Sequence, residues 1–310
     1  MSNEISIFHF TKLRDSDFGL FLDRIPLSER LTVCVDIEDS ITDFFNPQNS
    51  FNIKKEYRRL LYSFFSSFNS KLKFGIRVNS ILSPEFNEDL ELLTSLRNKF
   101  NSVFVPKCKS HDEVSATIFE FEKNKIGVNN FIPIIECSEG LQNLNDIVSK
   151  KNPKVKMIAF GHCDYNLNQN IFPFKHQEDE QYWKWVNNFY DTLKNTELGF
   201  INSPYLKLEH NYGFIRNLKR FTGYNFSQKG QITLTTAQIN LCLNLNNHKS
   251  EDISFTKSKK LNRGVFAKSL LNNFKKDFNI RKGFSIKNNF GELISPQEYI
   301  AAKKFMNVNY

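Results

Sequence analysis

In two short stretches of the sequence, an apolar run is followed by an acidic residue. Residues 132–140 read IPIIECSEG, where Glu136 closes the run, and residues 157–165 read MIAFGHCDY, where Asp164 follows the run and Gly161. Two carboxylates with several positions left to water are a common arrangement for a hard cation such as Mg²⁺. A 2-oxo acid would chelate such an ion, which stabilises the enolate formed when an adjacent C–C or C–H bond breaks. The sequence therefore predicts a Mg²⁺ site on Glu136 and Asp164.

Charged side chains also stand at or just beyond the ends of three further apolar runs. They are Glu38, Asp39, Arg77 and Lys107. Acids at such positions are partly explained as helix starts, where they complement the helix dipole. Cations do not suit a helix start, so Arg77 and Lys107 favour a functional site. A guanidinium there can bind a substrate carboxylate through two parallel hydrogen bonds.

His162 leaves two interpretations open. It lies two residues before Asp164, so both side chains would face the same way on an extended strand. A carboxylate–histidine–carboxylate site for a softer metal is then conceivable. The other interpretation, which we favour, is a histidine that is hydrogen-bonded within the rim of the site.

These residues need a scaffold that brings strand ends together. Eight β-rich runs lie at 5–10, 31–37, 72–78, 102–106, 131–136, 155–160, 198–203 and 230–234. Most are followed by apolar residues at helical spacing, and nearly all-apolar strands separated by helices imply a parallel sheet. Eight repeats in roughly 250 residues predict a closed (β/α)8 TIM barrel over residues 1–245. An open doubly wound sheet is the alternative, but no glycine-rich phosphate-binding turn is present.

Residues 246–310 are expected to form a basic, helical C-terminal extension. The formal charge of the chain is +9, and residues 255–289 contain ten Lys and Arg against one acid, Asp277. An anionic partner would explain this cluster, and so would a solvated, Lys-rich helical face. A non-catalytic protein that binds anions or nucleic acid on a degenerate barrel is therefore an alternative function. The phenylalanines of the segment are spaced as a packing face, which argues against nucleic acid as the partner.

The sequence also indicates the cellular compartment in which the protein is expected. No stretch approaches about 18 consecutive apolar residues, and no signal-type run follows the first residues, so we expect a soluble, cytoplasmic protein without a membrane partner. The five cysteines form no C-x-x-C pair and are interpreted as free thiols in a reducing compartment.

Five motifs, in order, resemble those of the citrate lyase beta-subunit family within the HpcH/HpaI aldolase superfamily. They are D-I-E-D at 36–39, I-R-V-N at 76–79, P-K at 106–107, I-E-C-S-E-G at 135–140 and F-G-H-C-D at 160–164. The resemblance implies a (β/α)8 barrel that assembles as a homotrimer or hexamer, with Mg²⁺ on Glu136 and Asp164. It also implies that Arg77 binds the carboxylate of the oxo acid, while Glu38 and Asp39 orient metal-bound waters. Lys107 of the P-K motif completes the expected catalytic group.

The implied activity is that of a Mg²⁺-dependent C–C lyase or aldolase acting on a pyruvate- or oxaloacetate-like 2-oxo acid through a metal-stabilised enolate. A malyl- or citramalyl-CoA-type lyase or thioesterase is the alternative. The family's first strand leads into a glycine- or proline-bearing loop, replaced here by residues 8–12, and its His-Pro pair near strand eight is absent from residues 228–239. We therefore favour an oxo-acid substrate without CoA, although a CoA, phosphate or sugar-nucleotide moiety could occupy the basic extension, which is expected to pack on a neighbouring subunit.

Overall fold

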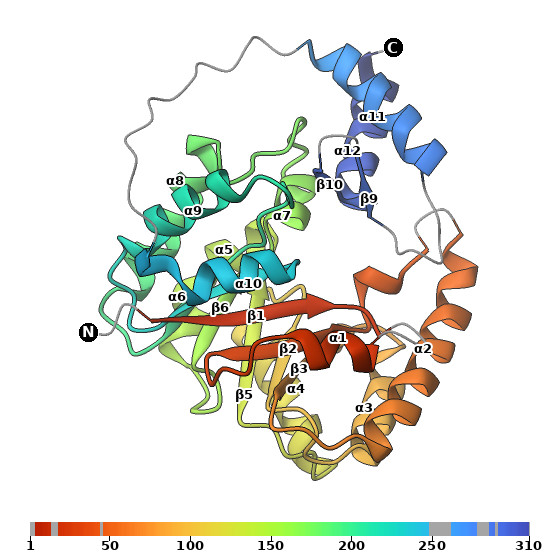
Figure 1. The fold of residues 1–310 in the computed structure, drawn as a ribbon, viewed down its shortest axis with the longest axis vertical. Helices are drawn as coiled ribbons and strands as arrows, with labels where there is room; N and C mark the ends of the chain where they lie inside the picture. Colours follow the sequence, from red (N-terminus) through yellow and green to blue (C-terminus); the bar gives the residue numbers. More distant parts are fainter. Residues whose placement is uncertain are drawn as a thin grey trace.

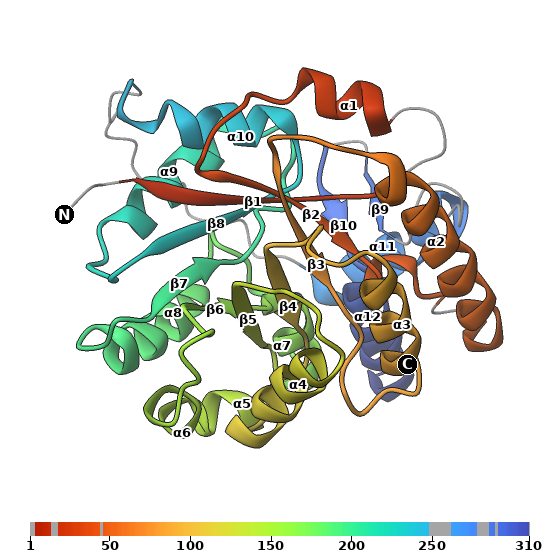
Figure 2. The ribbon, with the colours of Figure 1, turned by 90° about the horizontal axis from the view of Figure 1, so that it is seen from below.

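Eight parallel strands close into a barrel in the order of the sequence in the computed structural model (Figure 1 and Figure 2). They are β1 (Ile5–Thr11), β2 (Leu31–Asp36), β3 (Lys73–Arg77), β4 (Ser102–Val105), β5 (Asn130–Ile135), β6 (Met157–Phe160), β7 (Gly199–Asn202) and β8 (Lys229–Thr233). Strand β1 pairs with both β2 and β8, which closes the sheet. The eight strands and the (β/α)8 barrel expected from the sequence are thus confirmed. The structure describes residues 4–13, 18–43, 46–247, 262–277, 285–288 and 291–309.

Helices follow the strands and surround the barrel (Figure 2). They are α1 (Phe18–Arg24), α2 (Pro47–Ser67), α3 (Phe86–Ser95), α4 (His111–Lys123), α5 (Ser138–Gln142), α6 (Leu144–Ser149), α7 (His162–Asn168), α8 (Glu180–Leu193), α9 (Asn211–Thr222) and α10 (Thr236–Leu243), with 3-10 turns at Asp39–Ile41 and Leu245–Asn247. Local signals start several of them. The Ser110 hydroxyl, for example, accepts a hydrogen bond from the Glu113 N–H (3.3 Å) at the start of α4.

The inside of the barrel is filled by side chains. Buried residues from seven strands meet there, among them Phe8, Cys34, Phe104, Met157 and Ile232. Phe104 lies near the centre of this cluster and makes an edge-to-face contact with Phe8 at 5.4 Å between ring centroids. Because the lumen is packed, a ligand can bind only beyond the ends of the strands, as in other barrels of this kind.

The C-terminal extension packs beside the barrel end at which the strands finish. It consists of α11 (Arg263–Asp277), α12 (Pro296–Asn309) and a small hairpin, β9 (Ile286–Lys287) and β10 (Leu293–Ile294) (Figure 1). Its apolar residues form a second core with the segment after α7, and this core includes Phe172, Phe174, Leu270, Phe274 and Tyr299. The hairpin is joined to the loop after β7 by two backbone hydrogen bonds, from Leu293 N to Leu206 O and from Leu208 N to Gly291 O.

Much of the basic segment at 255–289 lies outside the described residues. Within the described part, Arg263 donates to the Phe172 carbonyl and lies 5.4 Å from the centroid of the Phe305 ring, so it packs within the extension. Lys287 pairs with Glu209. Packing of the extension on a neighbouring subunit, and assembly as a trimer or hexamer, stay predictions. No helix in the described part of the chain is long and apolar enough to cross a membrane.

Candidate active site

Asp36, the last residue of β2, organises one side of the strand-end face. Its carboxylate accepts hydrogen bonds from the backbone N–H groups of Glu38 (3.0 Å) and Ser40 (3.2 Å), so it fixes the turn that follows the strand. It also accepts from Arg77 Nε at 2.8 Å and pairs with Arg77 Nη2. Asp36 and Arg77 are register partners on the neighbouring strands β2 and β3, which explains why they meet.

The two cations expected at the site are both held by acids. Arg77 Nη1 lies 3.2 Å from Glu38 Oε2, and Lys107 Nζ lies 2.5 Å from Glu38 Oε1 and 3.3 Å from Asp39 Oδ1. The contact at Glu38 Oε1 lacks hydrogen-bond geometry, so this buried oxygen has an ion-pair neighbour but no hydrogen-bond donor. Three of the five N–H groups of Arg77 face Asp36 and Glu38, which leaves two for a substrate carboxylate.

Glu136 and Asp164 stand at the ends of the adjacent strands β5 and β6. Glu136 is 3% exposed, and its Oε1 accepts a hydrogen bond from the Lys107 N–H at 2.6 Å. The carboxylate lies directly against Gly161, where an added Cβ would lie 2.4 Å from Glu136 Oε2 and 2.7 Å from Glu136 Cβ. Asp164 lies in the first turn of α7. The structure therefore brings the two predicted ligands to one rim, and the absence of a side chain at Gly161 allows Glu136 to lie close to the chain there.

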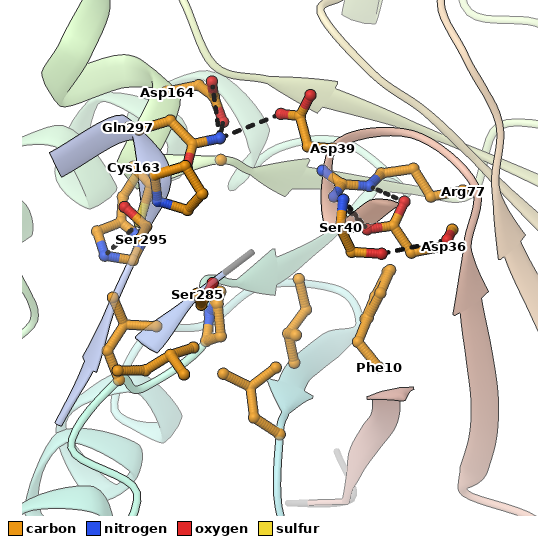
Figure 3. A pocket seen from close by; sticks show the side chains of 18 of the residues that line it. Phe10, Asp36, Asp39, Ser40, Arg77, Cys163, Asp164, Ser285, Ser295 and Gln297 are labelled. Carbon is orange, nitrogen blue, oxygen red and sulfur yellow. Dashed lines mark hydrogen bonds and ion pairs between the residues drawn. The ribbon is translucent and has the colours of Figure 1, made fainter. Parts of the chain in front are cut away.

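Gln297, from the start of α12, reaches into this acidic group. Its amide Nε2 lies 3.1 Å from Asp39 Oδ2 and 3.3 and 3.2 Å from the two carboxylate oxygens of Asp164 (Figure 3). Sequence reasoning did not find Gln297, because 133 residues separate it from Asp164 in the chain. The C-terminal extension thus contributes a side chain to the site of its own chain.

His162 is buried within a hydrogen-bonded pair. Its Nε2 lies 3.0 Å from His176 Nδ1, and its ring makes an edge-to-face contact with Tyr182. Burial and the neighbouring His176 hold the pKa of His162 well below its usual range. Among the described residues, no group of three or more His, Cys, Asp and Glu side chains is placed to hold one ion. The hydrogen-bonded interpretation therefore describes His162, and the structure gives no support to a histidine-containing metal site.

The acidic group carries more negative charge than its two cations balance. Burial and repulsion by Asp39 raise the pKa of Glu38 to about 8 and that of Asp164 to about 7. Burial and repulsion by Asp164 and Glu38 raise the pKa of Glu136 well above its usual range. Asp36 differs: although burial opposes ionisation, the Arg77 guanidinium holds its pKa below the usual range. A divalent cation between Glu136 and Asp164 would relieve this repulsion, and two carboxylates with water and substrate as further ligands suit Mg²⁺.

A cavity of about 610 Å³ opens beside these groups. Asp36, Asp39, Arg77, Glu136, Asp164 and Gln297 line part of it, and Phe10 lies toward its other side (Figure 3). Of the predicted site residues, Glu38 and Lys107 do not line the cavity. Each contacts a residue that does, because Glu38 pairs with Arg77 and the Lys107 N–H donates to Glu136. The arrangement therefore offers an acidic cation site beside a guanidinium, within a cavity large enough for an organic substrate.

Comparisons with known proteins agree with this fold. A sequence profile described as HpcH/HpaI aldolase/citrate lyase matches residues 21–232. Malate synthase from Haloferax volcanii, in a ternary complex with pyruvate and acetyl-CoA, is 12% identical, with 99% of this chain and 91% of that chain covered and a TM-score of 0.70. The citrate lyase beta subunit from M. tuberculosis, complexed with oxaloacetate and magnesium, is 14% identical, with 78% and 96% covered and a TM-score of 0.60. RipC from Yersinia pestis is 17% identical, with 78% and 95% covered and a TM-score of 0.58.

The comparison with curated proteins gave no match. The structural likenesses, at these low identities, concern the fold. The profile match is of a different kind, because it spans the six complete strands β2 to β7, all of β8 except Thr233, and the acids that form the rim. Since this match covers more than half of the sequence, the chain belongs to the HpcH/HpaI aldolase/citrate lyase family.

Proposed function

We propose that the protein is a Mg²⁺-dependent carbon–carbon lyase or aldolase that acts on a pyruvate- or oxaloacetate-like 2-oxo acid through its enolate. The observation that carries the proposal is the pair Glu136 and Asp164, which lie just beyond the ends of the adjacent strands β5 and β6, with raised pKa values, beside Arg77 and a cavity. Two structures of the same fold contain a 2-oxo acid, oxaloacetate in one and pyruvate in the other. Membership of the family supports lyase chemistry in general.

The residues divide into a binding group and a positioning group. Mg²⁺ held by Glu136 and Asp164 would supply the Lewis acid that withdraws charge from the 2-oxo group. Arg77 binds the substrate carboxylate through the N–H groups that Asp36 and Glu38 leave open. Glu38 and Asp39 fix Lys107, and the backbone of Lys107 fixes Glu136. Asp39, which lines the cavity, accepts hydrogen bonds from water in the site.

Gln297 is a positioning residue in this proposal. Its amide group lies between Asp39 and Asp164, so it sets the separation of the two carboxylates and closes the cavity on the side of α12. The closure limits access of water to the site, where an enolate would otherwise be protonated by solvent. No side chain of the described residues is assigned as the general base.

Exchange of the methyl protons of pyruvate with D₂O tests the proposal without knowledge of the second substrate. The wild type is expected to catalyse the exchange with Mg²⁺, as followed by loss of the methyl signal in proton NMR, and to lose the activity with EDTA. Cleavage of malyl- or citramalyl-CoA without pyruvate exchange would favour the alternative thioester lyase or thioesterase. If neither reaction occurs with any divalent cation, the barrel is a binding protein and the proposal is wrong.

Gly161→Ala is expected to weaken Mg²⁺ binding about 10- to 100-fold, as changes next to metal ligands commonly do. The new Cβ would overlap the side chain of Glu136, including its Cβ, so the ligand must move away from the rim. Isothermal titration with Mg²⁺ in the presence of oxalate measures the change. The matched control is Gly19→Ala, where an added Cβ has no neighbour within 4 Å. Equal affinities in the two variants would show that Glu136 needs no close approach at Gly161.

A further inference from the structure

The two sides of the cavity differ in the side chains that predominate. The turns and residues at the ends of β2, β3, β5 and β6 contribute the charged side chains already described, which are Asp36, Asp39, Arg77, Glu136 and Asp164. Strands β7, β8 and β1, which are neighbours in the closed barrel, and the residues after them contribute mainly apolar side chains, with Thr11 and Lys12 as the polar exceptions. We refer to Phe10, Phe21, Leu206, Leu208, Leu234 and Leu293 as the apolar arc.

Alternation along the chain explains why these side chains face the cavity. Leu206 and Leu208 line it, whereas Lys207 between them points elsewhere and pairs with Glu178 (3.3 Å) and Glu292 (3.5 Å). This segment is held extended by the backbone bonds to the hairpin that carries Leu293. Leu234 directly follows β8 and lines the cavity, as does Ile232 two residues before it within that strand.

The apolar arc is not ordinary core. Phe10, Phe21, Leu208, Leu234 and Leu293 are each only partly buried, because part of their surface faces the cavity. The neighbouring cation, Lys12, donates to the Ser40 carbonyl, so its charge is directed to the acidic side. Exposure of this apolar surface to water is unfavourable in free energy, and an apolar ligand that covers the surface would gain that free energy on binding.

Resting on the proposed function, we propose that the second substrate is an aldehyde with an apolar substituent, which binds against the apolar arc. In the condensation, C3 of pyruvate loses a proton and forms a bond to the carbonyl carbon of the aldehyde, whose oxygen gains a proton. The product is a 4-hydroxy-2-oxo acid with an apolar group on C4. Cleavage is the reverse and returns pyruvate and the aldehyde, so no oxidant or reductant is needed.

The position of the arc fits this geometry. A 2-oxo acid bound between Arg77 and the carboxylate pair occupies the acidic side, so the space left for a second substrate is the part of the cavity lined from β7, β8 and β1. A cavity of about 610 Å³ is far larger than a three-carbon acid requires. The remaining space is bounded by aromatic and leucine side chains, which favour hydrocarbon over a second carboxylate.

The test is the rate of pyruvate condensation with a series of aldehydes at fixed Mg²⁺. From acetaldehyde to butanal to hexanal, kcat/KM is expected to rise about fourfold per added methylene, the value for full burial of one CH₂. Succinate semialdehyde, an anion of similar length to butanal, is expected to react at least about tenfold more slowly than butanal, because its carboxylate would be desolvated against leucine.

Leu234→Ser is expected to lower the hexanal-to-acetaldehyde ratio of kcat/KM about tenfold, whereas Leu27→Ser leaves it unchanged. Leu27 is 72% exposed and does not line the cavity. The ratio of the two kcat/KM values is compared because a loss of folded enzyme lowers both values equally and leaves their ratio unchanged. Pyruvate exchange without any preference for longer aldehydes would overturn this inference alone. Turnover of an acyl-pantetheine thioester, but of no aldehyde, would assign the arc to a thioester arm instead. Absence of exchange would overturn the proposed function as well.

Discussion

Asp36→Ala is expected to lower the free energy of unfolding by about 3–5 kcal/mol, the usual cost of removing one partner of a buried ion pair. The substitution leaves the buried guanidinium of Arg77 with Glu38 as its remaining carboxylate among the contacts described. It also removes the acceptor of the Glu38 and Ser40 N–H groups, so the turn that carries Asp39 loses its support. Urea denaturation, with and without EDTA, measures the loss.

An exposed pair gives the matched control for Asp36→Ala. Asp191 pairs with Lys194 at 2.8 Å, but its side chain is 67% exposed. Asp191→Ala is therefore expected to change the free energy of unfolding by less than about 1 kcal/mol. If the two variants are equally stable, Asp36 does not anchor the rim, and the fixed orientation of Arg77 must have another source.

Glu136→Gln and Asp164→Asn are each expected to slow pyruvate exchange at least about 1,000-fold. Either change removes the negative charge of one proposed metal ligand and so weakens binding of the cation. A bound cation acts as a Lewis acid and would stabilise the developing enolate by several kcal/mol. The metal-free variants should be no less stable than the wild type, because the carboxylates they replace repel their neighbours. Proton NMR with Mg²⁺ gives the rates, and thermal unfolding in EDTA verifies the fold.

Glu139→Gln is the control for this pair of variants. Glu139 follows Glu136 by three residues, but its side chain is 61% exposed and pairs with Lys109 outside the site. Exchange by this variant should stay within about twofold of the wild type, as expected for an exposed surface position. Exchange within about tenfold of the wild type in either ligand variant would mean that the carboxylate pair does not carry the chemistry.

The barrel could be predicted because each strand is a local signal. Runs such as 31–37 and 155–160 are nearly all apolar, as expected for a covered parallel strand, and the chain has eight β-rich runs. The position of Glu136 and Asp164 on one rim followed from the same logic, since parallel strands end on the same side. The pairing of Asp36 with Arg77 also follows from register, but only once the strands are aligned.

Local signals were less reliable at one helix start. Ser83, Pro84 and Glu85 predict a capped helix beginning at the proline, whereas α3 begins at Phe86. The Ser83 hydroxyl bonds instead with Glu85, whose N–H it accepts at 3.3 Å, so these residues form a turn before the helix. A serine followed by proline therefore does not distinguish a cap from a turn when the next residues can bond to the serine.

The closure of the site could not be predicted from the sequence. Gln297 and Leu293 lie beyond the end of the barrel, and their approach to Asp164 and Leu206 depends on how the extension packs on Phe172 and Phe174. That packing is a tertiary contact between segments that are far apart in the sequence, such as Arg263 and Phe172, which are 91 residues apart. The apolar arc is likewise visible only after β7, β8 and β1 are known to be neighbours.

The central claim is that Glu136 and Asp164 hold a divalent cation that in turn binds a 2-oxo acid. Thermal unfolding with Mg²⁺ and oxalate, a mimic of the pyruvate enolate, tests it most directly on the wild type beside Glu136→Gln and Asp164→Asn. Oxalate at about 100 times its dissociation constant should stabilise the Mg²⁺-loaded wild type by about 2.7 kcal/mol. We predict that this shift requires both ligands together and is absent from both variants. A shift that persists in the variants, or no shift in the wild type with either ligand, would contradict the claim.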